Sequence, residues 1–357
     1  MQTYFPEIKK NFGFGMMRLP MTGENVDIPQ TCAMVDAFLE AGFNYFDTAH
    51  GYIGGKSELA VKDCLTSRYP RESYILTDKL SPNFFNTEAE IRPYFESMLE
   101  ACGVEYFDFY LMHAQSQNNY DKYMQCRAYE IAQELKAEGK VRHVGLSFHD
   151  SAEFLDKILT EHPEVEVVQI QFNYADMENP KVQSRACLEV CRKHGKPVIV
   201  MEPVKGGRLV NLPVAARQIL EELEGGSVAS YAIRFAAGFE GMMMVLSGMG
   251  DLDMVKDNCG YMVDFKPLDV AEQAAVEKVA AILADKDLIA CTGCRYCVDG
   301  CPAAIDIPAW FAAANERKLY GREVKVRGAD PMSCLQCGQC EDSCPQKLPI
   351  RELLEKL

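Results

Sequence analysis

The segment Phe107 to His113, with the sequence FDFYLMH, is a short and mainly apolar run that ends in an ionisable residue. It is followed by an amphipathic stretch, 120–138, whose spacing predicts a helix. From residue 11 onward this unit, an apolar run followed by an amphipathic stretch, recurs until eight have passed. Units of this kind with nearly all-apolar strands predict an α/β protein built on a closed parallel (β/α)8 TIM barrel rather than on an open sheet.

The boundaries of these units follow from the same pattern. The predicted strands are 13–19, 44–48, 74–79, 107–113, 143–148, 165–172, 197–202 and 242–247, and the predicted helices are 29–41, 57–65, 87–102, 120–138, 151–160, 180–194, 226–237 and 251–263. An open nucleotide-binding sheet usually has a Gly-rich turn after its first strand. Here Gly13-Phe14-Gly15 is followed by Met16-Met17-Arg18, so that turn is missing.

Length and charge restrict the classes of protein that remain. The 357 residues exceed one ordinary domain, but a barrel of about 250 residues with a small second domain accounts for them. The net charge of −15 repels nucleic acid and anionic lipid, so neither is an expected partner. No apolar run approaches a membrane span of about 20 residues, and residues 1–6 lack the pattern of a secretion signal. We therefore expect a cytoplasmic protein.

The fifteen cysteines are unevenly placed, since eight of them lie between residues 291 and 344. These eight form two runs of identical spacing, C-x-x-C-x-x-C-x-x-x-C-P, at 291–302 and 334–345. In such runs the fourth Cys serves the partner cluster. One [4Fe–4S] cluster is therefore predicted to bind Cys291, Cys294, Cys297 and Cys344, and the other Cys334, Cys337, Cys340 and Cys301. The other seven cysteines are predicted to be mostly buried apolar residues.

The doubled run resembles a bacterial two-cluster ferredoxin domain. Zinc is the alternative, but zinc ribbons use two ligands per knuckle and leave the third Cys unexplained. We expect a barrel over 1–264, a linker helix within 265–290 and a ferredoxin-type domain over 291–357. Between the two runs lies a basic patch that suits an acidic electron carrier such as a ferredoxin or flavodoxin: Arg317, Lys318, Arg322, Lys325 and Arg327.

Ionisable residues follow three neighbouring predicted strands, at the end where parallel barrels place their chemistry. They are Asp47, Lys79 and His113, and Tyr52 lies in the loop after Asp47. A Lys ammonium beside a Tyr favours the phenolate, so Lys79 is predicted to lower the pKa of Tyr52, and Asp47 to anchor Lys79. A neutral His113 can donate an N–H to a carbonyl oxygen. The set suits reduction of a carbonyl or oxidation of an alcohol.

The segments that carry these residues, FDTAHGY at 46–52, LTDK at 76–79 and DFYLMH at 108–113, resemble the catalytic motifs of the aldo-keto reductases. The likeness continues through GLS at 145–147, VQIQ at 168–171, MEP at 201–203 and the segment 247–258. By this resemblance Tyr52 is the general acid and base, Lys79 and Asp47 adjust its acidity, and His113 orients the carbonyl. The family holds a nicotinamide dinucleotide across the barrel rim without a Rossmann domain.

The same resemblance assigns cofactor contacts. Ser147 and Gln169 match positions that hold the nicotinamide carboxamide, and Gly206, Ser247, Gly248, Met249 and Asn258 match segments around the pyrophosphate and adenosine. Phe148 stands where many members have Asn, and Met254 stands where a basic residue usually meets the 2′-phosphate of NADP. Both NADP and NAD are therefore retained as cofactors. A flavin would connect one-electron and two-electron steps, but no motif supports one.

Three functional hypotheses remain. The leading prediction is an oxidoreductase of the aldo-keto reductase type that acts on a small carbonyl or alcohol and carries two clusters for electron transfer. The alternative is an electron-transfer protein in which the barrel binds nucleotide or a partner. A third hypothesis makes the clusters structural or oxygen-sensing. The ferredoxin-type domain replaces the C-terminal loops of single-domain relatives, so it is placed to cover the barrel mouth.

Overall fold

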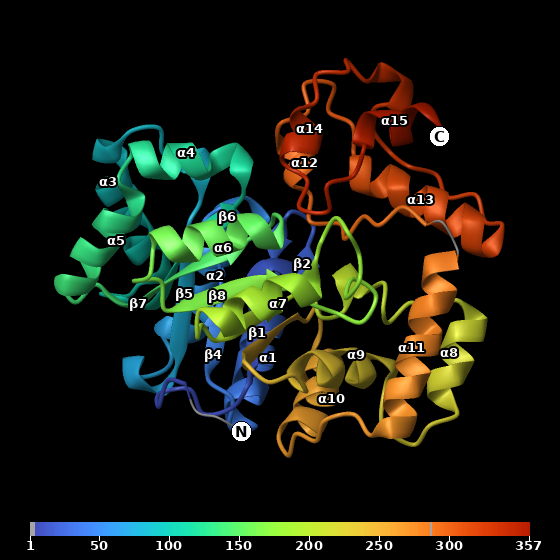
Figure 1. The fold of residues 1–357 in the computed structure, drawn as a ribbon, viewed down its shortest axis with the longest axis horizontal. Coiled ribbons are helices and arrows are strands. Elements are labelled where there is room, and N and C mark those ends of the chain that lie inside the picture. Colours follow the sequence, from blue (N-terminus) through green and yellow to red (C-terminus); the bar gives the residue numbers. More distant parts are fainter. Residues whose placement is uncertain (1–3, 286–287) are drawn as a thin grey trace.

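A closed barrel of parallel strands forms the body of the protein in the computed structural model, which describes residues 4–285 and 288–357 (Figure 1). The strands are hydrogen-bonded in the order β1-β10-β9-β8-β7-β6-β5-β4. Their bounds are β1 Phe12–Gly15, β4 Tyr45–Asp47, β5 Ile75–Leu80, β6 Phe107–Gln115, β7 Val141–Phe148, β8 Val167–Gln171, β9 Val198–Met201 and β10 Met242–Gly248. The predicted TIM barrel is confirmed.

Helices connect the strands and cover the outside of the barrel. They are α1 Ile28–Glu40, α2 Lys56–Val61, α3 Glu88–Cys102, α4 Gln117–Gln125, α5 Ala128–Ala137, α6 Ala152–Glu161, α7 Ser184–Lys193, α8 Val214–Glu221, α9 Val228–Ala237 and α10 Leu252–Met262. A two-stranded hairpin, β2 Met21–Thr22 and β3 Asn25–Val26, precedes α1. Single helical turns of the 3-10 type include 16–18, 52–55 and 205–207.

Alternation along the strands separates two apolar layers. On β6, Phe109 and Leu111 belong to the cluster inside the barrel, whereas Tyr110 and Met112 belong to the cluster between the strands and the helices. This is the alternation that a strand buried on both faces requires. At the opposite end from the site described below, Phe5 closes the interior by packing edge-on against Phe109, with ring centroids 5.1 Å apart.

Local signals set the ends of several helices. Asp27 caps α1 by accepting from the Gln30 amide at 3.0 Å, and Asp251 caps α10 by accepting from the Met254 amide at 2.8 Å. The stretch 120–138, predicted as one helix, is two helices. Arg127 lies between them with φ at 52°, a left-handed conformation that ends the helical hydrogen-bond pattern. The sequence also did not predict α8.

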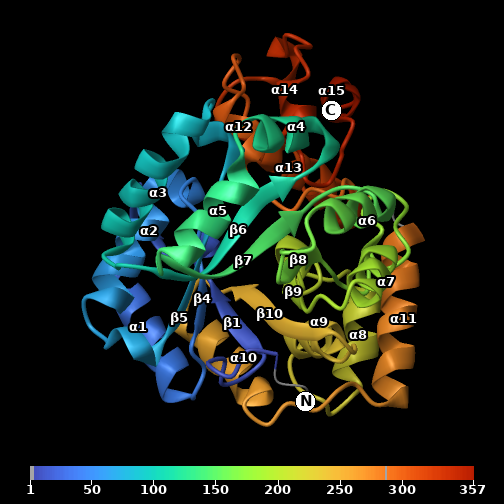
Figure 2. The ribbon, with the colours of Figure 1, turned by 60° about the vertical axis from the view of Figure 1, so that its left-hand side comes forward.

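After the barrel the chain continues as α11 Val270–Asp285 and then as a cysteine-rich unit, residues 288–357, with α12 Tyr296–Asp299, α13 Ile307–Tyr320, α14 Gln339–Asp342 and α15 Ile350–Glu355. α11 lies beside α8 in both ribbon views (Figures 1 and 2), and the buried ion pair of Arg234 with Glu272, 2.7 Å, joins it to α9. The cysteine-rich unit sits above the end of the barrel toward which the arrows of β6 and β7 point (Figure 2).

The cysteine-rich unit has a small core of its own. Ile305, Ile307, Phe311, Ile350 and Leu354 are buried together with Cys297 and Cys340. Trp310 packs against this core and donates its indole N–H to the Ala329 carbonyl at 3.0 Å. Within residues 4–285 and 288–357, none of the helices has the length and apolar character needed to cross a membrane.

Candidate active site

The carboxyl ends of β4, β5 and β6 bring the four predicted residues together. Lys79 is fully buried, and its Nζ donates to Asp47 Oδ1 at 2.7 Å, to the Thr48 carbonyl at 2.7 Å and to the Tyr52 hydroxyl at 3.3 Å. Gln169 Nε2 lies 3.3 Å from Asp47 Oδ2. Both oxygens of the buried carboxylate thus have a donor, and the Lys79 ammonium is directed at Tyr52.

His113 lies on the other side of Tyr52. The two rings stand edge to face with their centroids 6.0 Å apart. Ser81 Oγ lies 2.6 Å from His113 Nδ1, so Nε2 is the ring nitrogen that remains for a substrate oxygen. Burial, together with the charge of Lys79, holds the pKa of His113 well below its usual value. The imidazole is therefore neutral at physiological pH, as the sequence argument required.

The predicted lowering of the pKa of Tyr52 is wrong. Burial is the largest effect and raises the pKa of Tyr52 well above its ordinary value, and the Asp47 carboxylate raises it further. The Tyr296 hydroxyl acts in the opposite direction and lowers it. The phenol is therefore protonated at neutral pH, which is the state that a proton donor needs.

The backbone is strained beside these residues. Ile53, directly after Tyr52, has φ at 54°, and Ala114, directly after His113, has φ at 53°. Glu202, at the end of β9, has φ at 56°. Residues with side chains rarely adopt this left-handed region, and such residues cluster at sites where the fold fixes a particular geometry.

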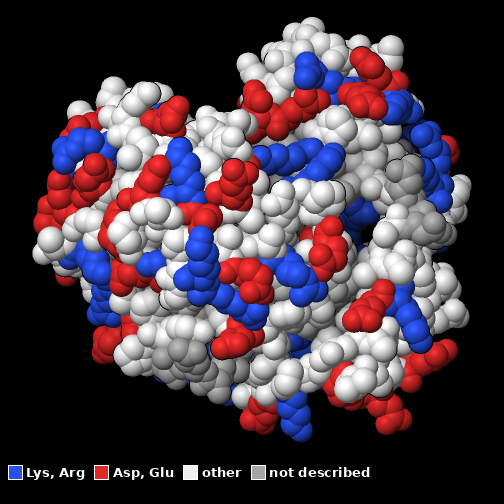
Figure 3. All heavy atoms as spheres, viewed as in Figure 1, with Lys and Arg blue, Asp and Glu red and all other residues white. Residues whose placement is uncertain are grey.

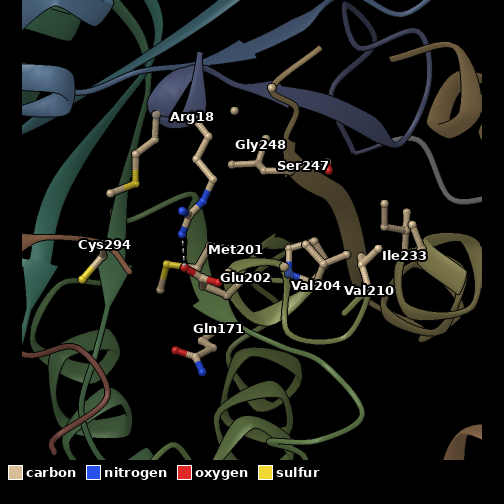
Figure 4. Close-up of a pocket in the computed structure, with 18 of the residues that line it drawn as sticks. Arg18, Gln171, Met201, Glu202, Val204, Val210, Ile233, Ser247, Gly248 and Cys294 are labelled. Carbon is tan, nitrogen blue, oxygen red and sulfur yellow. Dashed lines mark ion pairs between the residues drawn. The ribbon is translucent and has the colours of Figure 1, made fainter. Parts of the chain in front are cut away.

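A cavity of about 630 Å³ opens at this end of the barrel (Figure 4). Tyr52, His113 and Asp47 line it at one end, and the loops after β9 and β10 line the rest. In Figure 4, Arg18 and Glu202 face each other across the cavity, and their ion pair spans 3.6 Å. Its volume lies within the range of small-molecule and cofactor sites.

Most of the predicted cofactor residues line this cavity: Ser147, Gln169, Gly206, Ser247, Gly248 and Asn258. Met249 differs, because its side chain is fully buried in the core between strands and helices. Ser147 Oγ is buried without a hydrogen-bond partner, and an orphaned hydroxyl on a cavity wall fits a ligand that supplies one. Asn258 Nδ2 contacts Ser247 Oγ at 3.3 Å.

The cavity is lined by two arginines, Arg18 and Arg217. Met254 lines it and is 48% exposed, at the position where the sequence lacks the usual basic residue. Asp257 also lines it and accepts from Ser227 Oγ at 2.6 Å. Lys256 is exposed but is absent from the residues that line the cavity.

The cysteine-rich unit brings its eight predicted ligands together in two sets. A small cavity of about 20 Å³ is lined by Cys291, Cys294, Cys297 and Cys344, and a second, also of about 20 Å³, is lined by Cys301, Cys334, Cys337 and Cys340. Each set combines three cysteines of one run with the fourth of the other. All fifteen cysteines are free thiols, and six of the seven outside these sets are buried, as predicted.

The unit docks on the barrel mouth through polar contacts near the cavity. Arg18 Nη2 donates to the Thr292 carbonyl at 2.8 Å, and Gln346 Nε2 donates to Gln171 Oε1 at 2.6 Å. Gly206 lies against the Thr292 backbone so closely that an added Cβ would come within 2.2 Å of the Thr292 oxygen. Cys294, Tyr296, Pro345 and Gln346 consequently form part of the cavity wall.

Some residues of the site were not predicted. Arg18 and Glu202 follow the first and seventh strands of the barrel in sequence order, so the strand-end argument that selected Lys79 applies to them as well. Tyr296 had no signal of its own, because it occupies a variable position between two cluster cysteines. Only the docking of the two parts of the chain places it beside Tyr52.

Comparisons with known proteins agree with this architecture. The aldo/keto reductase family profile matches residues 11–281, and a 4Fe-4S dicluster domain profile matches residues 290–348. The chain is 27% identical over 195 residues to an NADH-specific methylglyoxal reductase of Escherichia coli, covering 49% of this chain and 57% of that protein. It is also 27% identical over 195 residues to a 9,11-endoperoxide prostaglandin H2 reductase of Trypanosoma cruzi, covering 54% of this chain and 64% of that protein.

A solved structure gives the same fold. An aldo-keto reductase from Klebsiella pneumoniae in complex with NADPH superposes with a TM-score of 0.62 at 20% identity, covering 76% of this chain and 95% of the other. The family profile covers most of the sequence, and the barrel has the topology of that structure. The chain belongs to the aldo/keto reductase family and carries a 4Fe-4S dicluster domain at its C-terminal end.

Proposed function

We propose that this protein catalyses nicotinamide-dependent reduction of a small carbonyl compound, or oxidation of the corresponding alcohol. The observation that carries the proposal is the set at the barrel mouth, in which Lys79 joins Asp47 to the Tyr52 hydroxyl and His113 lies beside it. Asp47, Tyr52 and His113 line a cavity large enough for a cofactor and a small substrate, and Lys79 is buried behind them.

Each residue has a distinct task in this proposal. A bound reduced nicotinamide would supply the hydride that the carbonyl carbon gains. The carbonyl oxygen receives the proton of Tyr52, whose raised pKa keeps that proton in place until it is needed. Lys79 donates to the Tyr52 oxygen as negative charge develops there, and Asp47 holds Lys79. His113 donates from Nε2 to the carbonyl oxygen and so places it beside Tyr52.

The cofactor is proposed to lie along the cavity. Ser147 and Gln169 are assigned to the carboxamide end, and Gly206, Ser247, Gly248 and Asn258 to the phosphate and adenosine end. Met249 would contribute through its backbone, because its side chain lies in the core. The relatives include an NADH-specific reductase and a structure with NADPH. Both NAD and NADP are compatible with the proposal, because Met254 and Asp257 do not attract a 2′-phosphate whereas Arg217, which lines the same cavity, can.

Tyr52→Phe tests the proposed chemistry. The variant removes one hydroxyl and keeps the ring, so the affinity for nicotinamide, measured by fluorescence titration, should change little. The turnover number for reduction of small aldehydes such as methylglyoxal should fall by about 10² to 10⁴. Unchanged turnover would contradict the role of Tyr52 and with it the proposed function.

The two cysteine sets are proposed to hold one [4Fe–4S] cluster each. Such clusters exchange electrons singly. Cys294 of the first set lines the same cavity as Tyr52, whereas Cys337 of the second set is exposed. This arrangement supports a second candidate function, in which the clusters carry electrons between a carrier outside the protein and the cavity.

The proposed division of the chain is a barrel, 1–264, a connecting segment, 265–290, and a ferredoxin-type domain, 291–357.

The proposed carrier is an acidic one-electron protein of the ferredoxin or flavodoxin class. Arg317, Arg322, Lys325 and Arg327 are exposed on α13 and the segment after it, and basic side chains gather at the outer edge of the upper lobe in Figure 3. Opposite charge on the two partners would accelerate their association.

Anaerobic titration with NADH and NADPH, followed by absorbance and electron paramagnetic resonance, distinguishes clusters that transfer electrons from clusters that are structural or oxygen-sensing. Cluster reduction by nicotinamide supports electron transfer, and its absence with full carbonyl reduction supports structural or oxygen-sensing clusters.

A further inference from the structure

Tyr296 connects the cysteine-rich unit directly to the proposed catalytic residues. It is the first residue of α12 and stands between Cys294 and Cys297 in sequence. Tyr296 and Tyr52 line the same cavity, both rings stand against the His113 ring, and the Tyr296 hydroxyl acts to lower the pKa of Tyr52. The Tyr296 ring stands edge to face with His113, with centroids 6.4 Å apart. Two of the four proposed catalytic residues therefore lie beside a side chain from outside the barrel.

The position of Tyr296 is fixed on several sides. Thr292, four residues earlier, accepts from Arg18 at 2.8 Å and packs against Gly206. Ile289 accepts from Arg208 Nη1 at 2.5 Å. These contacts join the loop that carries Tyr296 to the strand ends and loops of the barrel rim. A residue held in this way can contribute to catalysis without losing conformational entropy at each turnover.

The phenolate oxygen that Tyr52 would carry after proton transfer requires hydrogen-bond donors to stabilise its charge. Once the proton has left, the oxygen carries negative charge in a buried site that also faces the carboxylates of Asp47, Asp78 and Glu202. Lys79 provides one donor at 3.3 Å, which is long for a charge-assisted hydrogen bond. Tyr296, whose ring stands against the same His113 as that of Tyr52, is placed at the cavity wall to provide a second donor. Two preorganised donors on one developing oxyanion are the arrangement found in oxyanion holes.

We propose that Tyr296 is a positioning residue for the reaction in the barrel. Its hydroxyl fixes the orientation of the Tyr52 hydroxyl and stabilises the phenolate that remains after proton transfer. The inference rests on the proposed function. In the reaction the carbonyl carbon gains a hydride, the nicotinamide is oxidised, the carbonyl oxygen gains the Tyr52 proton, and solvent returns a proton to Tyr52. The iron–sulfur domain would then complete the active site by its fold, whether or not electrons cross between them.

The experiment uses the full-length, iron-loaded protein with Tyr296→Phe, which keeps the ring packing on His113 and removes the donor. We expect kcat for carbonyl reduction to fall at least tenfold, while KM and the dissociation constant for the nicotinamide change less than about twofold. The solvent deuterium isotope effect on kcat should rise, because transfer of the Tyr52 proton becomes slower. Iron and sulfide content should equal those of the wild type.

Two further variants make the result specific. Tyr320→Phe removes a hydroxyl from the exposed end of α13 in the same unit and should leave every measurement unchanged. Tyr296→His restores an N–H donor on a ring and should recover part of the rate lost in Tyr296→Phe. A Tyr296→Phe protein with kcat within twofold of wild type overturns the proposal. So does a loss of rate that is matched by a loss of iron or of nicotinamide affinity, since that pattern marks a structural role.

Failure of this inference is distinguishable from failure of the proposed function. If Tyr52→Phe abolishes turnover and Tyr296→Phe does not, the barrel chemistry stands and Tyr296 is a packing residue. If Tyr52→Phe retains turnover, the proposed function itself is wrong.

Discussion

At the scale of single residues, the Lys79 and Asp47 pair holds two opposite charges at a fully buried position. Burial raises the pKa of Asp47, and the Lys79 ammonium opposes that rise. Removing one member of such a pair leaves the other charge without compensation, which costs about 3–5 kcal/mol, whereas removing both costs less. Stability and catalysis can therefore be separated at this site.

We predict that Lys79→Met lowers the free energy of unfolding by about 3–5 kcal/mol and that adding Asp47→Asn restores most of it. Carbonyl reduction should stay at least about 100-fold below wild type in both variants, because each lacks the donor to Tyr52. Urea unfolding measures the stability, and steady-state kinetics the activity, of the wild type, the single variant and the double variant. A double variant that regained activity together with stability would show that Lys79 has only a structural role.

The second prediction at the residue scale concerns Met254 and the preference of the enzyme for NADPH or NADH. It lies at the end of the cavity where related enzymes are expected to meet the 2′-phosphate of NADP, and Asp257 is beside it on the same wall. Met254→Arg should raise kcat/KM for NADPH relative to NADH by about tenfold or more, since guanidinium forms paired hydrogen bonds with phosphate. Met332→Arg, at an 83% exposed position of the cysteine-rich unit, adds the same charge elsewhere and should leave the ratio unchanged. An unchanged ratio in Met254→Arg would place the adenosine elsewhere.

At the scale of elements, Glu166 holds β7 against the start of β8. It accepts from Lys136 Nζ at 2.6 Å, from His143 Nδ1 at 2.9 Å and from the Val144 amide at 3.0 Å. Burial acts to raise the pKa of Glu166, but these hydrogen bonds outweigh it and lower that pKa to about 2. A carboxyl whose pKa is depressed on folding stabilises the protein above its unfolded pKa, and this stabilisation is lost as pH falls through the folded value.

Glu166→Gln should therefore lower the free energy of unfolding by roughly 1–3 kcal/mol at pH 7, after allowance for partial exposure of the side chain. The difference from wild type should shrink as the pH falls from about 4.5 toward 2, where the wild-type carboxyl becomes protonated as well. Chemical unfolding at several pH values measures this. Glu224→Gln, at an exposed position, is the control and should cost little at any pH. If the difference in free energy of unfolding did not change with pH, the stabilisation would come from the packing of the Glu166 side chain and not from its charge.

Elements were predictable wherever the pattern was local. Apolar strands such as β9 and β10 begin and end within about one residue of their predicted limits, because burial on both faces selects apolar residues at nearly every position. The division of 120–138 into α4 and α5 was missed because Arg127 adopts its left-handed conformation without a Gly or Pro to mark it. The acidity of Tyr52 was predicted in the wrong direction, since the sequence identifies Lys79 as a neighbour but does not show the depth of burial.

At the scale of the whole molecule, proposed catalytic residues of the barrel and residues of the cysteine-rich unit, Cys294 and Tyr296 among them, line one cavity. The family resemblance predicted that the C-terminal domain covers the barrel mouth, but no pattern predicts which residues meet there, because the contacts join residues as far apart as Gln171 and Gln346. Gly206 lies at the centre of that interface. It has φ at 62°, and an added Cβ would stand 2.2 Å from the Thr292 oxygen, which is backbone and cannot swing aside.

Gly206→Ala should push the cysteine-rich unit away from the barrel mouth and move Tyr296 with it. A displacement of about 1 Å in a positioning group can cost about 100-fold in rate, so kcat/KM should fall by at least about tenfold while the iron content is retained. Gly195→Ala is the matched control, since Gly195 has φ at 65° with nothing within 4 Å of an added Cβ. It imposes the same left-handed strain, about 1–2 kcal/mol, without the clash. Kinetics, iron assays and thermal unfolding on both variants separate the two effects, and equal losses of activity in both would show that docking of the unit does not govern the site.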